Sequence, residues 1–208
     1  MYNPPAFRED RLDILHDAIA RHPLGLLITA GSDGLAANLL PFLVTGEGPH
    51  GTLQAHLARA NDQVEVLRAG AEAMVVFQGP QAYVTPSWYP GKTEHGKVVP
   101  TWNYVVVQAW GRPVVIDDPE WLRRQIGALT DSREQGRAEA WTVEDAPESY
   151  IEAQIRGIIG LEIPIGRIEG KWKVSQNRSE ADRLKVAEGM LAEGQAVMAA
   201  LVADSVRG

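Results

Sequence analysis

The sequence contains no cysteine. This absence excludes disulfide bonds, thiolate metal sites and a cysteine nucleophile, and it fits the reducing cytoplasm, where we expect this chain. The histidines show no paired metal-ligand spacing, so we predict no metal site. Glycine-rich phosphate loops of the dinucleotide or P-loop type are missing, as is the Gly-x-Ser-x-Gly pattern of many serine hydrolases.

Long apolar runs and clusters of positive charge are equally scarce. No stretch approaches the ~20 apolar residues that span a bilayer, and the first residues lack the pattern of a signal peptide, so we expect no membrane partner. The net charge of -7 argues against a nonspecific nucleic-acid binder, which needs a basic face to displace counterions. DNA binding through a local basic patch stays possible, but the charge does not support it.

The remaining composition is that of an ordinary globular domain. With 208 residues, 45% of them hydrophobic, the chain is long enough to bury a core. Apolar and β-branched runs alternate with glycine-containing turns and do not follow the regular strand–helix alternation of a parallel sheet. We therefore predict a mainly β fold with helical inserts (α+β).

Several elements can be placed in advance. Pro164 and Gly166 are expected to interrupt a late strand, and the segment after them is expected to be its partner. Strands are predicted over 24–30, 35–45, 52–57, 112–116, 160–168 and 171–175. Helices are predicted over 9–21, 62–69, from 119 to about 129, over 148–156 and, as the longest, over about 179–206.

The segment from Val75 to Gly111 carries the most informative pattern. Two β-rich runs flank a loop that contains Trp88, Tyr89, Lys92 and Lys97. Two such runs joined by a Gly/Pro-containing loop predict antiparallel partners in a sheet. Wide rings, cations and short polar side chains suit a flat, polar-edged, anionic ligand. An alternative is a long hairpin whose exposed aromatic residues help to close a dimer.

Four separated segments combine hydrogen-bond donors with apolar neighbours. They are residues 37–42, 56–61, 97–104 and 173–178. In the second segment, Arg59 comes just before a predicted helix, where free backbone N–H groups and the helix dipole favour an anion. A simply solvated arginine is the alternative.

The same segments resemble the PaiB-like family, the FMN-binding negative transcriptional regulators. The resemblance rests on MYNPPAF, ANLLPFLV, HLARAND, GPQAYVTPSWYPGKTEHGKVVPTWNY and GIIGLEIPIGRIEGKWKVSQNR, in this order over nearly the whole chain. It implies one FMN-binding domain over 1–208, a split β-barrel of the pyridoxamine-phosphate-oxidase-like type with a long C-terminal helix. It also implies a homodimer that binds FMN at the subunit interface.

The resemblance further implies a set of FMN-binding residues. Arg59 and Asn61 would hold the phosphate, and Lys97 or Lys173 would add positive charge. Residues 38–40 would run along the isoalloxazine, residues 101–104 would wall the ring or the ribityl chain, and residues from 176 to 178 would close the site. The full set is Asn38, Leu39, Leu40, His56, Arg59, Asn61, Lys97, Thr101, Trp102, Asn103, Tyr104, Lys173, Gln176 and Arg178.

The chain departs from the family pattern at three positions. Ala6, Gln81 and Gln108 stand where histidine is common in the family. Loss of these ionisable groups puts any haem-binding or proton-transfer role at those positions in doubt, while FMN binding is unaffected.

Three functions remain open at this point. The first is an FMN-binding regulator of the PaiB-like kind. The second is a flavin-dependent oxidoreductase that passes electrons between NAD(P)H and a small acceptor. The third is a dimeric scaffold whose pocket is empty or holds another flat anion.

Overall fold

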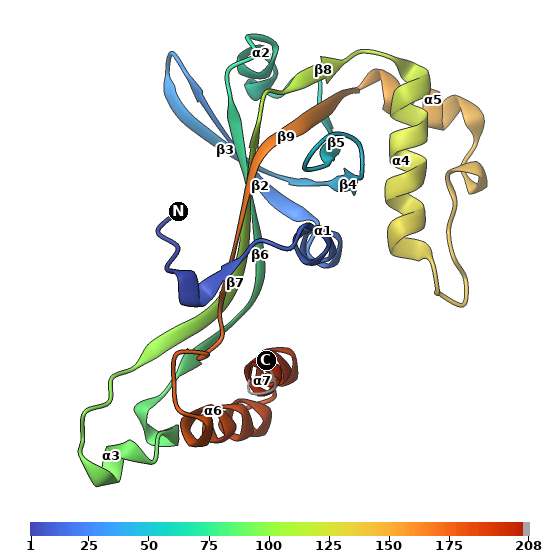
Figure 1. Ribbon diagram of the computed structural model, residues 1–208. Coiled ribbons are helices and arrows are strands. Elements are labelled where there is room, and N and C mark those ends of the chain that lie inside the picture. Colours follow the sequence, from blue (N-terminus) through green and yellow to red (C-terminus); the bar gives the residue numbers. More distant parts are fainter. Residues whose placement is uncertain (206–208) are drawn as a thin grey trace. The chain divides into compact units, whose positions relative to one another are not determined.

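The computed structural model describes residues 1–205, which form two compact units. Unit 1 consists of Met1–Leu15, Gln78–Val107 and the residues from Glu169 onward, and unit 2 consists of His16–Phe77 and Gln108–Ile168. Figure 1 shows the course of the chain through both units.

All nine strands of residues 1–205 belong to one antiparallel sheet. They are β1 (Arg8–Glu9), β2 (Leu24–Gly31), β3 (Gly34–Pro41), β4 (Leu43–Thr45), β5 (Thr52–Ala58), β6 (Ala73–Val84), β7 (Thr101–Gly111), β8 (Val114–Ile116) and β9 (Ile158–Lys173). Hydrogen bonds connect them in the order β3-β2-β6-β7-β9-β5-β4, and β1 and β8 also pair with β9. Within residues 1–205 this path has two ends, β3 and β4, so the sheet is open. The predicted mainly β architecture is confirmed, and β6 and β7 are neighbours as the central segment indicated.

Strand β9 differs from the sequence-based prediction. Residues 158–173 form one continuous strand, without the expected break at Pro164 and Gly166 and without a separate partner over 171–175. The strand is supported in turn by β5 and β8 over its first half and by β1 near its end. Pro164, opposite Thr52, forms the last pair of the β5–β9 ladder, where the loss of one N–H donor costs little. The prediction was wrong because pairing with successive neighbours outweighs the local preference of two residues.

The helices lie outside this sheet, and several have clear capping signals. They are η1 (Pro5–Phe7), α1 (Leu12–Arg21), α2 (Gln63–Arg68), η2 (Pro86–Trp88), α3 (Gly91–Glu94), α4 (Pro119–Glu134), η3 (Val143–Asp145), α5 (Glu148–Arg156), α6 (Glu180–Ala192) and α7 (Ala196–Asp204). The carboxylate of Asp118 accepts a hydrogen bond from the Glu120 N–H at 3.0 Å, and Pro119 follows as the first helical residue, which explains where α4 begins. Among the helices of residues 1–205, none combines the length and the apolar character that a membrane crossing requires.

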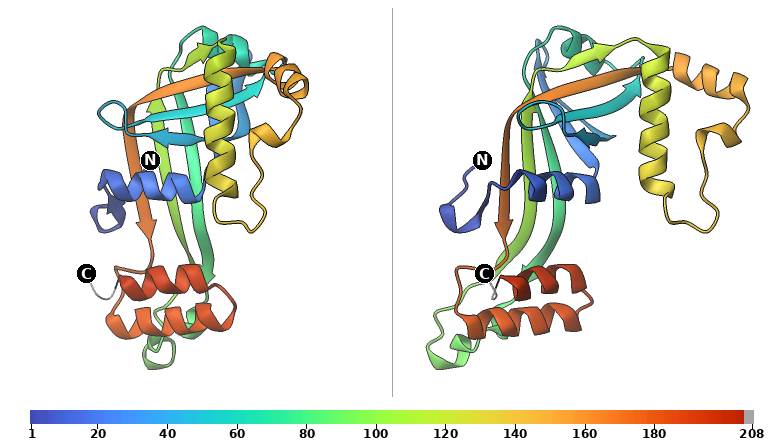
Figure 2. Two further views of the ribbon diagram at one scale, coloured as in Figure 1. Left: turned by 90° about the vertical axis from the view of Figure 1, so that its right-hand side faces the viewer. Right: turned by 45° about the vertical axis from the view of Figure 1, so that its right-hand side comes forward.

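The long C-terminal helix predicted for 179–206 is two helices, which lie side by side in Figure 2. Helix α6 begins after Ser179, whose hydroxyl caps the Asp182 N–H, and it ends before Gly194. Gly194 has a φ of +78°, a left-handed conformation that glycine adopts readily and that ends a helix. Residue 206, the predicted end, lies outside the described residues.

Each unit has its own buried core. In unit 2 the rings of Phe42 and Phe77 meet edge to face at 5.7 Å, and a Cβ at Gly25 would lie 2.7 Å from Phe77, so glycine is needed for this close approach. The core of unit 1 joins the helices α6 and α7 to residues of β6 and β7. Its buried members include Val84, Tyr89, Val105, Val186, Met190, Met198 and Val202.

Two helical glycines give a matched test of this packing. We expect Gly189→Ala to lower the free energy of unfolding by about 1–3 kcal/mol, because a Cβ there would overlap the indole of Trp88. Gly127 in α4 has open space around it, so Gly127→Ala should instead raise the free energy of unfolding by about 0.5–1 kcal/mol. Urea unfolding of both variants measures the two values. A Gly189→Ala variant as stable as the parent chain would contradict the packing of α6 on Trp88.

Candidate functional site

The HLARAND motif, residues 56–62, covers the end of β5 and the connection to α2. The Oδ1 of Asn61 accepts a hydrogen bond from the backbone N–H of Gln63 at 2.9 Å. The Gln63 side chain is buried; its Oε1 accepts a hydrogen bond from Asn38 Nδ2 at 3.0 Å, and its Nε2 donates to Thr29 Oγ1 at 2.9 Å. Two residues predicted from separate motifs, Asn38 and Asn61, are therefore brought together by Gln63. Sequence reasoning missed Gln63, which lies two residues beyond Asn61 and just after the HLARAND motif.

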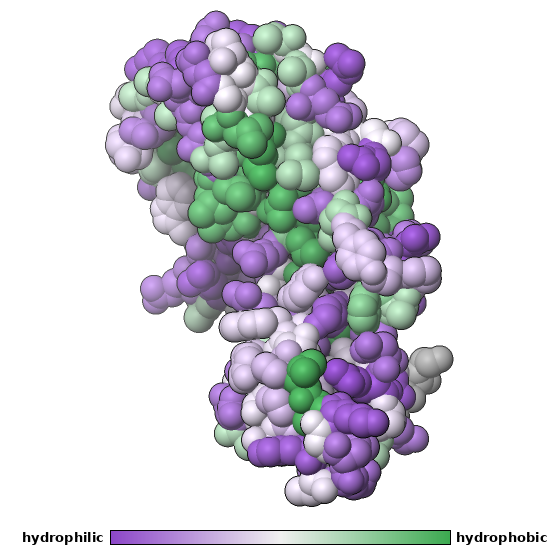
Figure 3. Space-filling model, turned by 90° about the vertical axis from the view of Figure 1, so that its left-hand side faces the viewer, coloured by the Kyte–Doolittle hydropathy of each residue, from purple (hydrophilic) through white to green (hydrophobic). Residues whose placement is uncertain are grey.

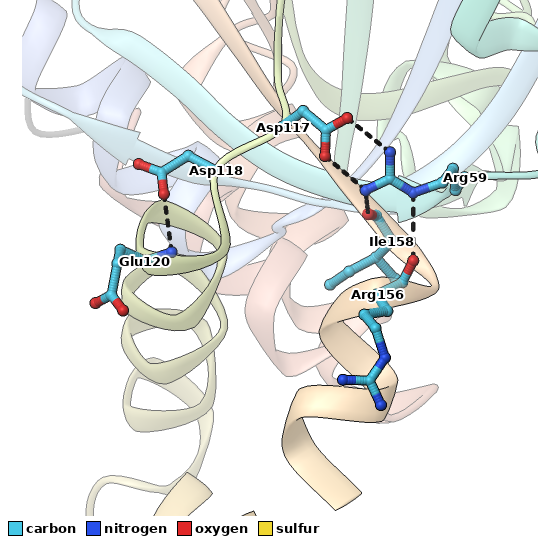
Figure 4. Close-up of polar contacts among 6 residues, drawn as sticks. All are labelled: Arg59, Asp117, Asp118, Glu120, Arg156 and Ile158. Carbon is cyan, nitrogen blue, oxygen red and sulfur yellow. Dashed lines mark hydrogen bonds and ion pairs between the residues drawn. The ribbon is translucent and has the colours of Figure 1, made fainter. Parts of the chain in front are cut away.

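Arg59 points toward the segment that precedes α4 (Figure 4). Its Nη1 and Nη2 donate to the two carboxylate oxygens of Asp117 at 2.8 and 2.7 Å. Nη2 also donates to the Ile158 carbonyl at 3.0 Å, and Nε donates to the Arg156 carbonyl at 3.3 Å. The hydrogen bonds from Arg59 lower the pKa of Asp117, and those to Asp117 raise the pKa of Arg59. Helix α2 has only six residues, so its dipole contributes little at this point.

The Arg59–Asp117 pair forms one wall of a pocket of about 550 Å³ in unit 2. The first turn of α4 and the helix α5, which lie near each other in Figure 2, supply most of the remaining lining. Leu122 and Ile155 give it an apolar floor, and Arg156 is among the charged groups around it. His56, the first residue of the HLARAND motif, is turned toward α4 as well: its Nδ1 lies 2.7 Å from Gln125 Oε1.

A second group of predicted residues meets in unit 1, around Lys173. Lys173 Nζ donates to Thr101 Oγ1 at 2.6 Å and to the Trp102 carbonyl. The ammonium groups of Lys173 and Lys171 lie 5.9 and 5.4 Å from the centre of the Tyr104 ring, within cation–π range. Burial lowers the pKa of Lys173, and the positive charges of Lys171 and Arg178 lower it further. An anion bound here would relieve this repulsion.

The segment from 173 to 178 is held in a fixed conformation. Ser175 has a φ of +66°, and among residues 1–205 it is the one non-glycine residue with a positive φ. Asn103 and Ser175 exchange hydrogen bonds at 2.9 and 3.2 Å, and both side chains are buried. The Gln176 side chain accepts from the Val174 N–H at 2.8 Å and so closes the turn. Asn103 and Gln176 thus position this segment, while Arg178 lies over the Tyr89 ring at 5.0 Å.

Two other predicted residues are exposed to solvent. Trp102 is 53% exposed and packs edge to face against Tyr83 at 5.8 Å. Lys97 is exposed, and its backbone N–H donates to His95 Nδ1 at 3.0 Å. Both therefore remain accessible to a ligand.

Strand β3 presents its predicted residues on two faces. Leu40 is buried, whereas Leu39 is 59% exposed and Leu35 is 80% exposed. The register places Leu39 opposite Leu26, and Leu26 in turn opposite Val76, so these side chains share one face of the sheet. We call this surface of unit 2 the apolar face, which consists of Leu24, Leu26, Ile28, Ala30, Leu35, Ala37, Leu39, Met74 and Val76. Figure 3 shows apolar side chains gathered on this side of the molecule.

Solved structures of flavoproteins have the same fold. The FAD and heme binding protein of Mycobacterium smegmatis superposes with a TM-score of 0.58 at 19% identity, covering 80% of this chain and 73% of that one. The flavocytochrome Anf3 of Azotobacter vinelandii gives a TM-score of 0.59 at 12% identity, covering 80% of this chain and 69% of that one. The split-barrel fold expected from the sequence is confirmed, with the open sheet described above.

Residues 1–167 match the family described as "Putative FMN-binding domain", so the chain belongs to this family and FMN is its cofactor. Protease synthase and sporulation protein PAI 2 of Bacillus subtilis is 28% identical over 188 residues, which cover 90% of this chain and 88% of that protein. An uncharacterized protein of Emericella nidulans is 35% identical over 225 residues, covering 91% and 90%. The resemblance to the PaiB-like family is thereby confirmed.

The residues of this chain fit FMN chemically. Arg59, in unit 2, carries a guanidinium suited to a phosphate, and Lys171, Lys173 and Arg178 place positive charges close together in unit 1. Asn38 supplies an amide suited to the polar edge of the isoalloxazine, and Asn61 supplies one suited to the phosphate. When bound, FMN would supply the capacity to accept and release electrons.

Proposed function

We propose that this FMN-binding chain is a homodimer that regulates transcription, as the PaiB-like negative regulators do. The observation that carries the proposal is the apolar face. Nine apolar side chains line one face of β2, β3 and β6, and Leu35 and Leu39 are more than half exposed. A contiguous apolar surface of this kind is typical of a surface that a partner covers.

A second copy of the chain is the partner we propose. The apolar face includes Leu39, which the family resemblance puts beside the isoalloxazine, and its neighbour Asn38 belongs to the network with Gln63 and Asn61. Two copies packed through this face would exclude water from the strand predicted to contact the flavin. In the proposed site, Arg59 and Asn61 of unit 2 hold the phosphate.

The regulatory role is supported by family membership and by the likeness to PAI 2, whose name refers to protease synthesis and sporulation. The net charge of -7 favours regulation that depends on a limited, sequence-specific contact or on another protein. The absence of cysteine supports a cytoplasmic location.

A flavin titration with the molecular mass determined in parallel tests the proposal. We expect a dimer that binds FMN and that retards promoter DNA sequence-specifically at physiological salt. A monomer would rule out the homodimer. Reduction of the bound FMN by NADH or NADPH faster than free FMN, without any effect on DNA, would identify the chain as an oxidoreductase instead.

A further inference from the structure

The guanidinium of Arg59 has almost no free donor capacity. A guanidinium carries five N–H groups, and four of those of Arg59 are used: two by Asp117, one by the Ile158 carbonyl and one by the Arg156 carbonyl. A phosphate can therefore not receive two hydrogen bonds from Arg59 while Asp117 keeps both of its own.

Asp117 uses the same edge of Arg59 that a phosphate would use. The two parallel N–H···O bonds run from Nη1 and Nη2 to the two carboxylate oxygens, which is the fork geometry that arginine also offers to phosphate. The two carbonyl acceptors bind other N–H groups, on Nε and on Nη2. Release of Asp117 would free the Nη1–Nη2 edge while the carbonyls of Arg156 and Ile158 still hold the guanidinium in place (Figure 4).

The pair is open to exchange with a dissolved anion. Its side chains are 39% and 58% exposed, and both line the 550 Å³ pocket. An exposed pair of this kind is weak enough for a bound phosphate to displace it. Because Arg59 lowers the pKa of Asp117, the carboxylate stays charged at neutral pH and is present as a competitor under physiological conditions.

We propose that Asp117 competes with the FMN phosphate for Arg59 and so sets the affinity of the protein for phosphorylated flavins. This inference rests on the proposed role of Arg59 as a phosphate residue. It makes Asp117 an affinity-determining residue, because its carboxylate must leave the guanidinium before the phosphate is bound. It also links FMN binding to the segment that begins α4, since Asp117 directly precedes that helix.

The test compares Asp117→Asn with Asp118→Asn in the full-length chain. Both variants lose one negative charge at neighbouring positions, but Asp118 contacts the Glu120 N–H rather than Arg59, and asparagine caps a helix as well as aspartate does. We expect Asp117→Asn to bind FMN about two- to fivefold more tightly, the range of an exposed ion pair, and Asp118→Asn to bind like the parent. Riboflavin, which lacks the phosphate, should bind all three proteins equally.

Each other outcome has a definite meaning. If the parent binds FMN but Asp117→Asn binds it no more tightly, the proposed competition by Asp117 is wrong, while FMN binding by the protein is unaffected. The same holds if riboflavin affinity rises as much as FMN affinity, since the effect would then not concern the phosphate. In an Arg59→Ala background, Asp117→Asn should have no effect, and a persisting gain would overturn the proposal. Failure of the parent to bind FMN would remove the proposed function and this inference together.

Discussion

Arg59→Ala is expected to weaken FMN binding by about 1.5–3 kcal/mol, roughly a 10- to 150-fold increase in Kd. The reason is the loss of a charge-assisted, two-pronged contact with the phosphate. Fluorescence titration of FMN measures the change, and riboflavin affinity should stay the same because it has no phosphate. The FMN affinity of Arg59→Lys should fall between that of the parent and that of Arg59→Ala, since lysine keeps the charge but loses the planar fork.

Arg124→Ala is a matched control for this experiment. Arg124 is an exposed arginine of α4 and is not part of the predicted FMN set, so we expect unchanged FMN affinity. Because Arg59 also bonds to the carbonyls of Arg156 and Ile158, the unfolding of Arg59→Ala should be measured in parallel. A folded Arg59→Ala variant with parental FMN affinity would remove Arg59 from the phosphate site.

Leu39→Asp is expected to convert the proposed homodimer to a monomer. The substitution puts an unpaired carboxylate into a surface that dimerisation would bury, at a cost of about 3–5 kcal/mol, which raises the dimer Kd by at least ~100-fold. Sedimentation equilibrium over a range of protein concentrations measures this directly. Since Leu39 is also predicted to contact the flavin, FMN affinity should fall together with the dimer.

Leu191→Asp is the corresponding control. Leu191 is 62% exposed, as open as Leu39, but it lies on α6 in unit 1 and outside the apolar face. The Leu191→Asp variant should have the same molecular mass in solution and the same FMN affinity as the parent. A dimer that survives Leu39→Asp unchanged would show that the subunits associate through another surface.

Local sequence signals predicted single elements well where a residue acts on its immediate neighbours. The helix predicted to start at residue 119 begins there as α4, and the strands predicted over 24–30 and 52–57 correspond closely to β2 and β5. The C-terminal helix shows the limit of such signals. Leu184, Leu191 and Met198 recur every seven residues, a spacing that fits the single helix predicted over 179–206, but Gly194 ends α6 between Leu191 and Met198.

Strand β9 and the buried amides fall outside what a local pattern can predict. The continuity of β9 through Pro164 depends on neighbours that are distant in sequence. Asn103 was predicted to wall a ligand, yet it is buried against Ser175, 72 positions away, and its role in binding FMN stays a prediction. Gln63 was missed because nothing next to it reveals that Asn38 and Thr29 are its partners.

The sequence by itself determined the mainly β fold, the family and the cofactor, because long motifs and strand patterns consist of residues that are adjacent in the sequence. Only the tertiary structure decided what those motif residues touch. Arg59 is paired with Asp117, 58 positions further along, and the nine residues of the apolar face come from three strands. The physical reason is that a hydrogen bond or a shared surface requires residues to be close in space. Which residues are close is fixed by strand register and helix packing, and a local sequence pattern does not contain this information.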